Sequence, residues 1–225
     1  KWKGDGAQTQ NMLNSKLVQK FADATVSAFF NYSVRIDTDY QDMSLEMTRR
    51  LGWQWDNYQP DWNRAVNAAK GIFTGGVNNL DDAYYLGRGL RRDSLAGATL
   101  DARIGEAYLK STLYHHRDNG QGHWYTPYTP SSSTMPISIR TTEYTINRSG
   151  MVNDLSWDFG AHALNAGFWL ERSRHGLERN FYAVDGPADT DYFLTQTMST
   201  GFRQQFTTST SQFYLQDTVM LLDDR

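Results

Sequence analysis

One segment, Ala24–Ile36, alternates between apolar and polar residues so regularly that it restricts the fold of the whole chain. Its even-numbered residues are apolar, and its odd-numbered residues are polar except for Phe29. Because side chains alternate between the two faces of a strand, the pattern predicts a strand with one dry and one wet face. Such a strand, tilted by ~40°, has a height of about 33 Å, whereas an ordinary globular strand has about 5–6 residues. The length therefore favours a strand that crosses a bilayer.

The composition agrees with a membrane protein that is built from strands. The chain has 225 residues, no cysteine and a net charge of −3, which gives no reason to expect a nucleic-acid partner. No apolar run approaches the ~18 residues of a membrane helix, so a chain of this kind crosses a bilayer only as a closed barrel. The mean hydropathy of −0.64 is compatible with a barrel, because only alternate residues face lipid.

Six further extended segments bring the predicted number of strands to seven. They are Thr9–Phe21, Ala83–Leu100, Glu106–Arg117, Ile137–Trp157, Ala163–Glu171 and Gln204–Leu221. The segment Ala163–Glu171 repeats the clean alternation, with Trp169 as its exception. Within Ile137–Trp157 the parity of the apolar residues changes, which predicts a β-bulge near Ser149 and Gly150.

The connections alternate between short turns and long aromatic loops. Short turns are predicted near Ala22, Arg103, Gly160 and Asp223, and long loops at Ser44–Asp82, Asp118–Pro136 and Ser173–Phe202. In the first loop, Asp61 as an N-cap and Gly71 at the other end predict a short helix. Short periplasmic turns and long extracellular loops are typical of outer-membrane barrels. We therefore predict an all-β fold, an antiparallel transmembrane β-barrel, with residues 1–225 as one partial barrel domain.

The two clean alternations also identify side chains that are expected to face lipid. These predicted lipid-facing residues are Val26, Ala28, Phe30, Tyr32, Val34, Leu164, Ala166, Phe168 and Leu170. If the sheet belonged to a soluble β-sandwich, the same residues would instead pack beneath a second sheet.

Aromatic residues in the long connections are the candidates for ligand binding. They are Trp53, Trp55, Tyr58, Trp62, Trp124, Tyr125 and Tyr128, with Arg88 or Arg91 as a cation for an anionic ligand. Two interpretations remain open: these rings enclose a ligand, or they pack loop against loop and anchor at the membrane interface.

Other chemistry has weaker support in the sequence. His115 and His116 are adjacent, so in a strand their rings point to opposite faces and do not share a metal ion. The stretch 78–82 is rich in Asn and Asp, but it lacks the spacing of a calcium loop and is better explained as a polar turn. No G-x-S-x-G motif occurs. We therefore predict no enzyme and assign no catalytic residue, metal ligand or cofactor, with a barrel enzyme that uses His116 as a remote alternative.

Three segments resemble parts of one family of membrane proteins. The sequence F-Y-L-Q-D-T-V-M-L-L-D-D-R at Phe213–Arg225 resembles a barrel strand of TonB-dependent outer-membrane receptors, and Trp157–Glu171 resembles one of their hairpins. The sequence G-L-R-R-D-S-L-A-G at Gly89–Gly97 is similar to one of their return strands. The resemblance covers most of the sequence from Ala83 onward.

The resemblance implies a role in nutrient uptake at the bacterial outer membrane. Receptors of this family import ferric siderophores and similar complexes through a barrel with an N-terminal plug, and a TonB-type partner supplies the energy. Neither the plug nor the segment that contacts this partner is recognisable here, and the predicted number of strands is odd, so we expect the chain to be a middle slice of the barrel. A passive porin-like channel and a soluble β-sandwich that binds carbohydrate remain the alternatives.

Overall fold

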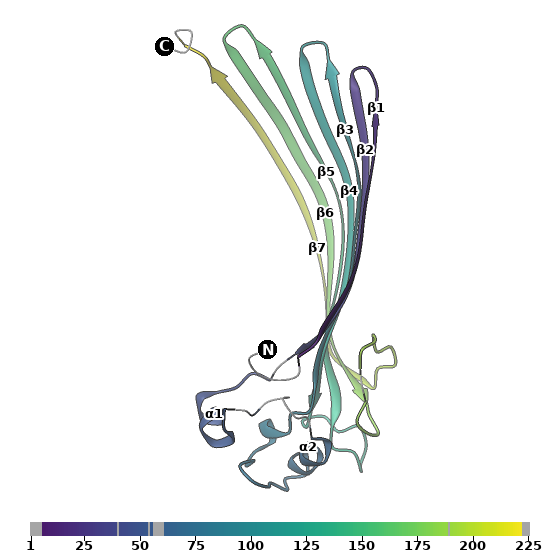
Figure 1. Cartoon of the computed structure of the whole chain (residues 1–225), viewed down its shortest axis with the longest axis vertical. Helices are drawn as coiled ribbons and strands as arrows, with labels where there is room; N and C mark the ends of the chain where they lie inside the picture. Colours follow the sequence, from purple (N-terminus) through teal and green to yellow (C-terminus); the bar gives the residue numbers. More distant parts are fainter. Residues whose placement is uncertain (1–5, 40, 54, 56–60, 189, 222–225) are drawn as a thin grey trace.

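Seven long strands form one antiparallel sheet in the order of the chain (Figure 1). The computed structural model describes residues 6–39, 41–53, 55, 61–188 and 190–221. The strands are β1 (Gln8–Lys20), β2 (Ala24–Asp39), β3 (Gly87–Ile104), β4 (Ala107–Thr126), β5 (Ser138–Phe159), β6 (His162–Ala183) and β7 (Ser199–Val219). This confirms the predicted all-β class and the predicted seven strands within the described part of the chain.

The short connections gather at one end of the sheet and the long ones at the other (Figure 1). β1–β2, β3–β4 and β5–β6 are joined by tight turns, and Gly105 and Gly160 adopt positive φ angles of 63° and 56° in two of them. A residue with a side chain adopts this backbone conformation only with strain. The turn predicted near Asp223 falls on residues outside the described part.

The first long loop carries the helices α1 (Leu45–Leu51), α2 (Trp62–Ala69) and the short 3-10 helix η1 (Leu80–Asp82). The predicted helix is confirmed as α2, because Asp61 accepts a hydrogen bond from the Arg64 amide and Gly71 has a φ of 76°. The helix α1 was not predicted from the sequence. None of the described helices has the length and the apolar character needed to cross a membrane.

The register of the sheet determines which residues share a face, because residues directly opposite each other in neighbouring strands point to the same side. Val26 of β2 lies in one row with Leu100 of β3, and Phe168 of β6 lies in one row with Phe213 of β7. When the rows are followed across all strands, both predicted lipid-facing sets fall on the same side, which we call the apolar face. We call the opposite side the polar face.

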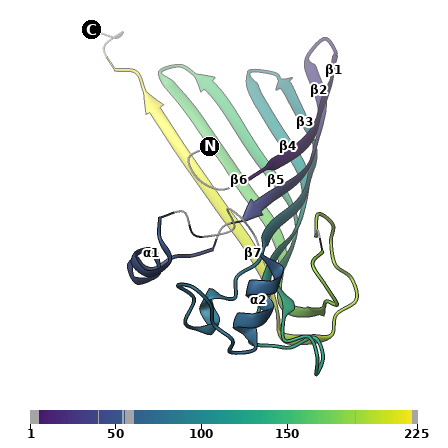
Figure 2. The same cartoon turned by 60° about the horizontal axis from the view of Figure 1, so that its bottom comes forward.

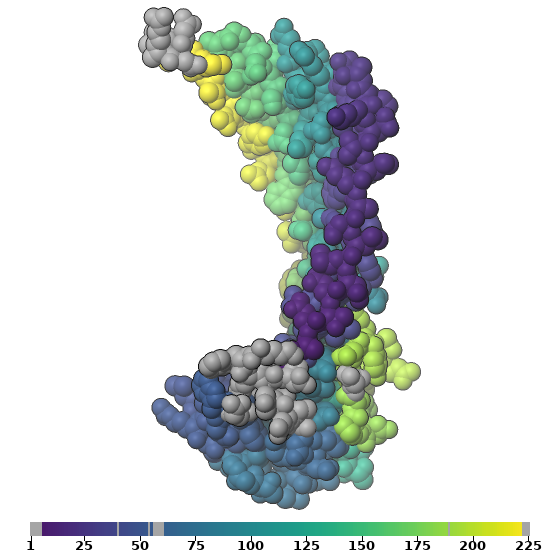
Figure 3. All heavy atoms as spheres, in the orientation of Figure 1, coloured from purple at the N-terminus to yellow at the C-terminus, as the bar shows by residue number. Residues whose placement is uncertain are grey.

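The turn-side half of the apolar face is uncovered. Within the described residues each strand contacts only its neighbours in the chain, and the helices lie at the long-loop end of the sheet, away from this half (Figure 3). Its large exposed side chains form what we call the apolar belt: Leu13, Leu17, Val26, Phe30, Leu100, Ile104, Leu113, Leu155, Trp157, Phe159, Leu170, Phe213, Leu215 and Val219. A soluble protein rarely exposes so large a contiguous apolar surface.

The polar face packs aromatic rings over glycines of the next strand. Phe29 lies directly opposite Gly97, and a Cβ atom at Gly97 would come within 2.5 Å of the Phe29 ring. The same arrangement joins Tyr114 to Gly150, Tyr144 to Gly120 and Tyr214 to Gly167. Phe29, the apolar exception on the wet face of its strand, is therefore explained by the glycine beside it.

Several details of the predicted strands are wrong. β3 spans Gly87–Ile104 rather than Ala83–Leu100, and β7 begins at Ser199, within a predicted loop. β4 and β6 continue to Thr126 and Ala183, through residues that were assigned to loops. Near the long loops both faces of the sheet carry polar residues, so the alternation that marks a strand disappears while the backbone ladder continues. The register shows no bulge at Ser149–Gly150; the shift lies between Arg179 and Asn180.

The sheet is curved and open (Figure 2). β1 pairs only with β2, and β7 pairs only with β6, so both outer strands have a free edge along the described part. Exposed strand edges of this length readily pair with further strands.

Candidate functional site

The long loops pack into a small core at their end of the sheet. Ala65 of α2 is fully buried against Tyr125, Ile139 and Tyr182 of the strands, with Trp62 beside them. The Trp62 ring meets Tyr125 edge to face at a centroid distance of 5.8 Å. The described part of the first long loop is therefore not a free coil, because α2 anchors it to the sheet.

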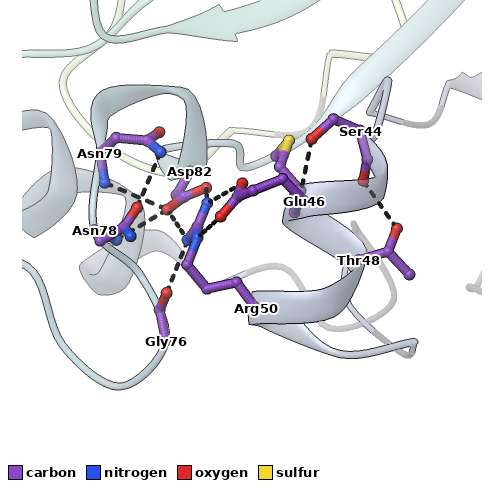
Figure 4. Close-up of polar contacts among 9 residues, drawn as sticks. Ser44, Glu46, Thr48, Arg50, Gly76, Asn78, Asn79 and Asp82 are labelled. Carbon is purple, nitrogen blue, oxygen red and sulfur yellow. Dashed lines mark hydrogen bonds and ion pairs between the residues drawn. The ribbon is translucent and has the colours of Figure 1, made fainter.

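A buried ion pair fixes α1 to the same module (Figure 4). Nη1 of Arg50 lies 2.6 Å from a carboxylate oxygen of Asp82, which is fully buried, and Nε of Arg50 lies 2.7 Å from Glu46. Backbone amides of Asn78 and Asn79 also donate to Asp82. The Asp82 carboxylate therefore has its partners within the protein, which is compatible with the polar turn predicted for the stretch 78–82.

The surroundings of Asp82 make the docking of α1 dependent on pH. Burial tends to raise the pKa of Asp82, but the hydrogen bonds from Arg50 and from the Asn78 amide outweigh burial and hold the pKa below its usual value. A lowered pKa in the folded state stabilises the module above about pH 4, and this stabilisation is lost as pH falls through the lowered pKa. We expect hydrogen-exchange protection of the α1 amides to fall in that range.

Replacing Asp82 tests the same ion pair. The variant Asp82→Asn loses charge-assisted hydrogen bonds, so we expect a cost of about 1.5–3 kcal/mol in the local opening free energy of α1 and a weaker pH dependence. Glu46→Gln is the matched control, since Glu46 contacts the same arginine from an exposed position. Equal loss of protection in both variants, measured by hydrogen exchange, would contradict this role of Asp82.

A cleft of about 530 Å³ opens between α1 and the loop ends of β4 and β5. Trp124 and Tyr128 line it together with Met47, Tyr84 and Arg140. Trp124 packs against Tyr84 at a centroid distance of 5.7 Å, and the Tyr128 hydroxyl donates to Asp81. Nε of Arg140 is buried and has no hydrogen-bond partner within the described structure. The cleft thus combines aromatic walls with a cation that has an unused donor.

The other predicted ligand residues are spread around this cleft. The Arg64 guanidinium lies over the Trp55 ring, 4.2 Å from the ring centroid. Trp53 is exposed beyond the C-terminal end of α1. Arg88 is held by Asp191 at 2.7 Å, on the apolar-face side of β3. Two further residues complete the set: Arg91, which is exposed on the polar face, and Tyr58, which lies outside the described residues.

Trp124 and Tyr125 differ from the prediction in their location. Both were expected in a loop, but they belong to β4, where they point to opposite faces. Tyr125 is only 4% exposed and donates its hydroxyl proton to the Ala188 carbonyl. Both residues line the cleft, but Tyr125 also belongs to the core.

A polar network that sequence reasoning missed crosses the polar face. His116 of β4 lies 2.6 Å from Asp93 of β3, and Nε of Arg148 on β5 donates to His116 Nδ1 at 3.0 Å. Because arginine only donates, Nδ1 is the acceptor and Nε2 carries the proton that Asp93 accepts. As predicted, His115 points to the other face, where its ring contacts Ser149.

The network continues across β6. Glu171 lies 3.9 Å from Arg148 and accepts a hydrogen bond of 2.5 Å from the Tyr114 hydroxyl. Trp169 donates to the same hydroxyl at 2.9 Å, which explains why this ring interrupts the alternation of its strand. Local patterns give no signal for a network of this kind, because its members come from four strands. Within the described part, no group of three His, Asp or Glu side chains is placed to hold a metal ion.

Comparison with known proteins does not place the chain in a family. Neither a protein-family model nor a curated protein matches this sequence.

Proposed function

We propose that this chain is part of an outer-membrane transport barrel that takes up a small-molecule ligand, in the manner of TonB-dependent receptors. The observation that carries the proposal is the apolar belt, a broad uncovered surface on one face of a single sheet. Its position between tight turns and long loops matches the arrangement of an outer-membrane barrel. In this proposal the apolar face contacts lipid and the polar face lines the lumen.

The length of the apolar alternation on β2 supports a bilayer as the partner of the apolar face. On β2 the apolar residues run from Val26 to Ile36, which corresponds to about 25 Å of height for a strand tilted by ~40°. The apolar band of outer-membrane barrels has a height of ~25 Å. On β6 the apolar side chains of this face end at Leu170, and arginines follow toward the loops.

The free edges of β1 and β7 support closure by further strands. An open sheet does not exist in a bilayer, because its unpaired backbone groups would lack hydrogen-bond partners in hydrocarbon. We therefore propose that additional strands complete the barrel. Energy from a TonB-type partner would reach it through a region other than the one described.

The cleft beside α1 is the proposed site of first ligand contact. It lies among the long loops, which face the cell exterior in this arrangement, and Trp124, Tyr128 and the cationic Arg140 line it. Aromatic rings and a guanidinium suit a planar, anionic ligand. A ferric siderophore is the ligand class that the resemblance suggests.

Uptake measurements in cells test the function. Deletion of the gene is expected to abolish uptake of a radiolabelled ferric siderophore, and an uncoupler that dissipates the proton gradient is expected to have the same effect. Uptake that persists with the uncoupler would instead indicate a porin-like channel. A protein that stays in solution without detergent would contradict any membrane function.

Binding measurements test the cleft. For an anionic siderophore complex, we expect Arg140→Gln to weaken binding about tenfold or more and Trp124→Ala about two- to tenfold, measured by fluorescence quenching of the protein in detergent. Trp53→Ala is the control, because this exposed ring does not line the cleft. If Trp53→Ala weakens binding as much as Trp124→Ala does, the ligand does not bind in the cleft.

A further inference from the structure

A patch of arginines lies on the apolar face immediately beyond the apolar belt. The last apolar row across the centre of the sheet is Leu113, Met151 and Leu170. The next two rows toward the loops contain three arginines, Arg117 of β4 and Arg172 and Arg174 of β6. We call these three residues the arginine patch.

The positive charge of the patch is not neutralised by the described residues. All three arginines are exposed, and none forms an ion pair within the described part of the chain. The nearest acidic residues of this face, Glu143 and Glu178, lie two rows further toward the loops, where they line a hollow together with Arg117. Glu178 is paired with Arg203 at 2.8 Å, and Glu143 accepts hydrogen bonds from three side chains.

The patch lies at the height of lipid headgroups if the belt lies in hydrocarbon. Arg172 and Arg174 follow Leu170 by two and four residues on the same strand and face, which corresponds to about 5 and 10 Å of height. Headgroup regions occupy roughly 5–8 Å on each side of a bilayer. Arg117 and Arg174 flank Asn147 from the two neighbouring strands, so their backbones are about 10 Å apart.

A hollow lies beside the patch. It has a volume of about 350 Å³, and its lining includes Arg92, Arg117, Asn119, Glu143, Glu178 and Phe193. The Arg92 guanidinium lies 5.3 Å from the centroid of the Phe193 ring, which belongs to the β6–β7 loop. The loop thus closes one side of a polar recess that begins where the apolar belt ends.

We propose that the arginine patch binds the phosphate groups of an anionic lipid headgroup in the leaflet next to the long loops. The proposal rests on the proposed function, because it requires lipid against the apolar belt. Charge complementarity and continuity with the belt identify a lipid as the occupant: a soluble anion would use the charge but not the adjoining apolar surface. Each arginine near an anionic surface contributes about fivefold in affinity, so two of them contribute about 30-fold.

Binding of diphosphorylated lipid A to the detergent-solubilised full-length protein tests the inference. We expect Arg117→Gln/Arg174→Gln to bind lipid A about 30-fold more weakly than the unmodified protein and Arg117→Lys/Arg174→Lys to keep most of the affinity. The matched control is Arg91→Gln/Lys110→Gln, which removes the same charge from exposed residues of the polar face on β3 and β4.

The possible outcomes separate this inference from the proposed function. If the unmodified protein is found in membranes but both glutamine variants bind lipid A alike, the inference is overturned and the transport barrel stands. Binding of inorganic pyrophosphate as tightly as lipid A would also overturn it, because the patch would then be a site for a soluble anion. If the unmodified protein is absent from the membrane fraction, both proposals fail.

Discussion

Arginine in place of Phe30 or Phe168 is expected to prevent the protein from accumulating in the outer membrane. Both rings lie on the apolar face, and Phe168 packs against Phe213 at a centroid distance of 6.2 Å. An arginine at the lipid face near the middle of the bilayer costs ~2–4 kcal/mol. The amount of folded, heat-modifiable protein in the outer-membrane fraction measures the effect.

Residues of the polar face provide the matched controls for this experiment. Ser33→Arg and Asn165→Arg place the same side chain on β2 and β6, but toward the proposed lumen. We expect these variants to assemble at near-normal levels, because an arginine there remains in water. Equal loss of assembly on both faces would show that the apolar belt does not face lipid.

Substituting Gly120 is expected to destabilise the sheet through a direct clash. A Cβ atom at this position would overlap the Tyr144 ring, which lies directly opposite on β5. Overpacking of this kind costs about 1–3 kcal/mol, so Gly120→Ala is expected to lower the urea midpoint of unfolding in detergent. In the double variant Gly120→Ala/Tyr144→Ala the clash is absent. Its loss of unfolding free energy is therefore expected to be smaller than the sum of the losses in the two single variants.

Gly122 is the control for the glycine experiment. It lies two residues further on the same strand and face, and a Cβ atom there would approach nothing closer than the Thr142 carbonyl oxygen at 3.8 Å. Gly122→Ala is therefore expected to leave the urea midpoint almost unchanged. If Gly120→Ala and Gly122→Ala lower the urea midpoint equally, the effect comes from the intrinsic strand propensity of the residue and not from a clash with the Tyr144 ring.

The sequence was most informative where the two faces of the sheet differ in polarity. Ala24–Ile36 alternates along its whole length, and its predicted strand is found with the predicted start. The tight turns and the capped helix α2 were also readable, because they depend on residues close together in the chain. Beyond Arg117 the prediction stopped too early, since both faces of β4 become polar and the periodic signal ends.

The sequence was less informative about the candidate site. The sequence identified Trp124 and Tyr128, but it gave no reason to separate them from Trp62 and Tyr125, which pack in a core. Nor did it indicate Arg140, which lines the cleft beside them. Such distinctions depend on contacts between loops and strands that are far apart in the chain.

The sequence by itself determined the class of the fold, the number of strands and the face that is apolar, because period and turn chemistry are local properties. Only the tertiary structure decided the register of the rows, and with it the pairing of Phe29 with Gly97 and the alignment of arginines beyond the belt. The physical reason is that a ring or a charge acquires its role from the residue opposite it. That residue belongs to another strand, and the local pattern carries no information about it.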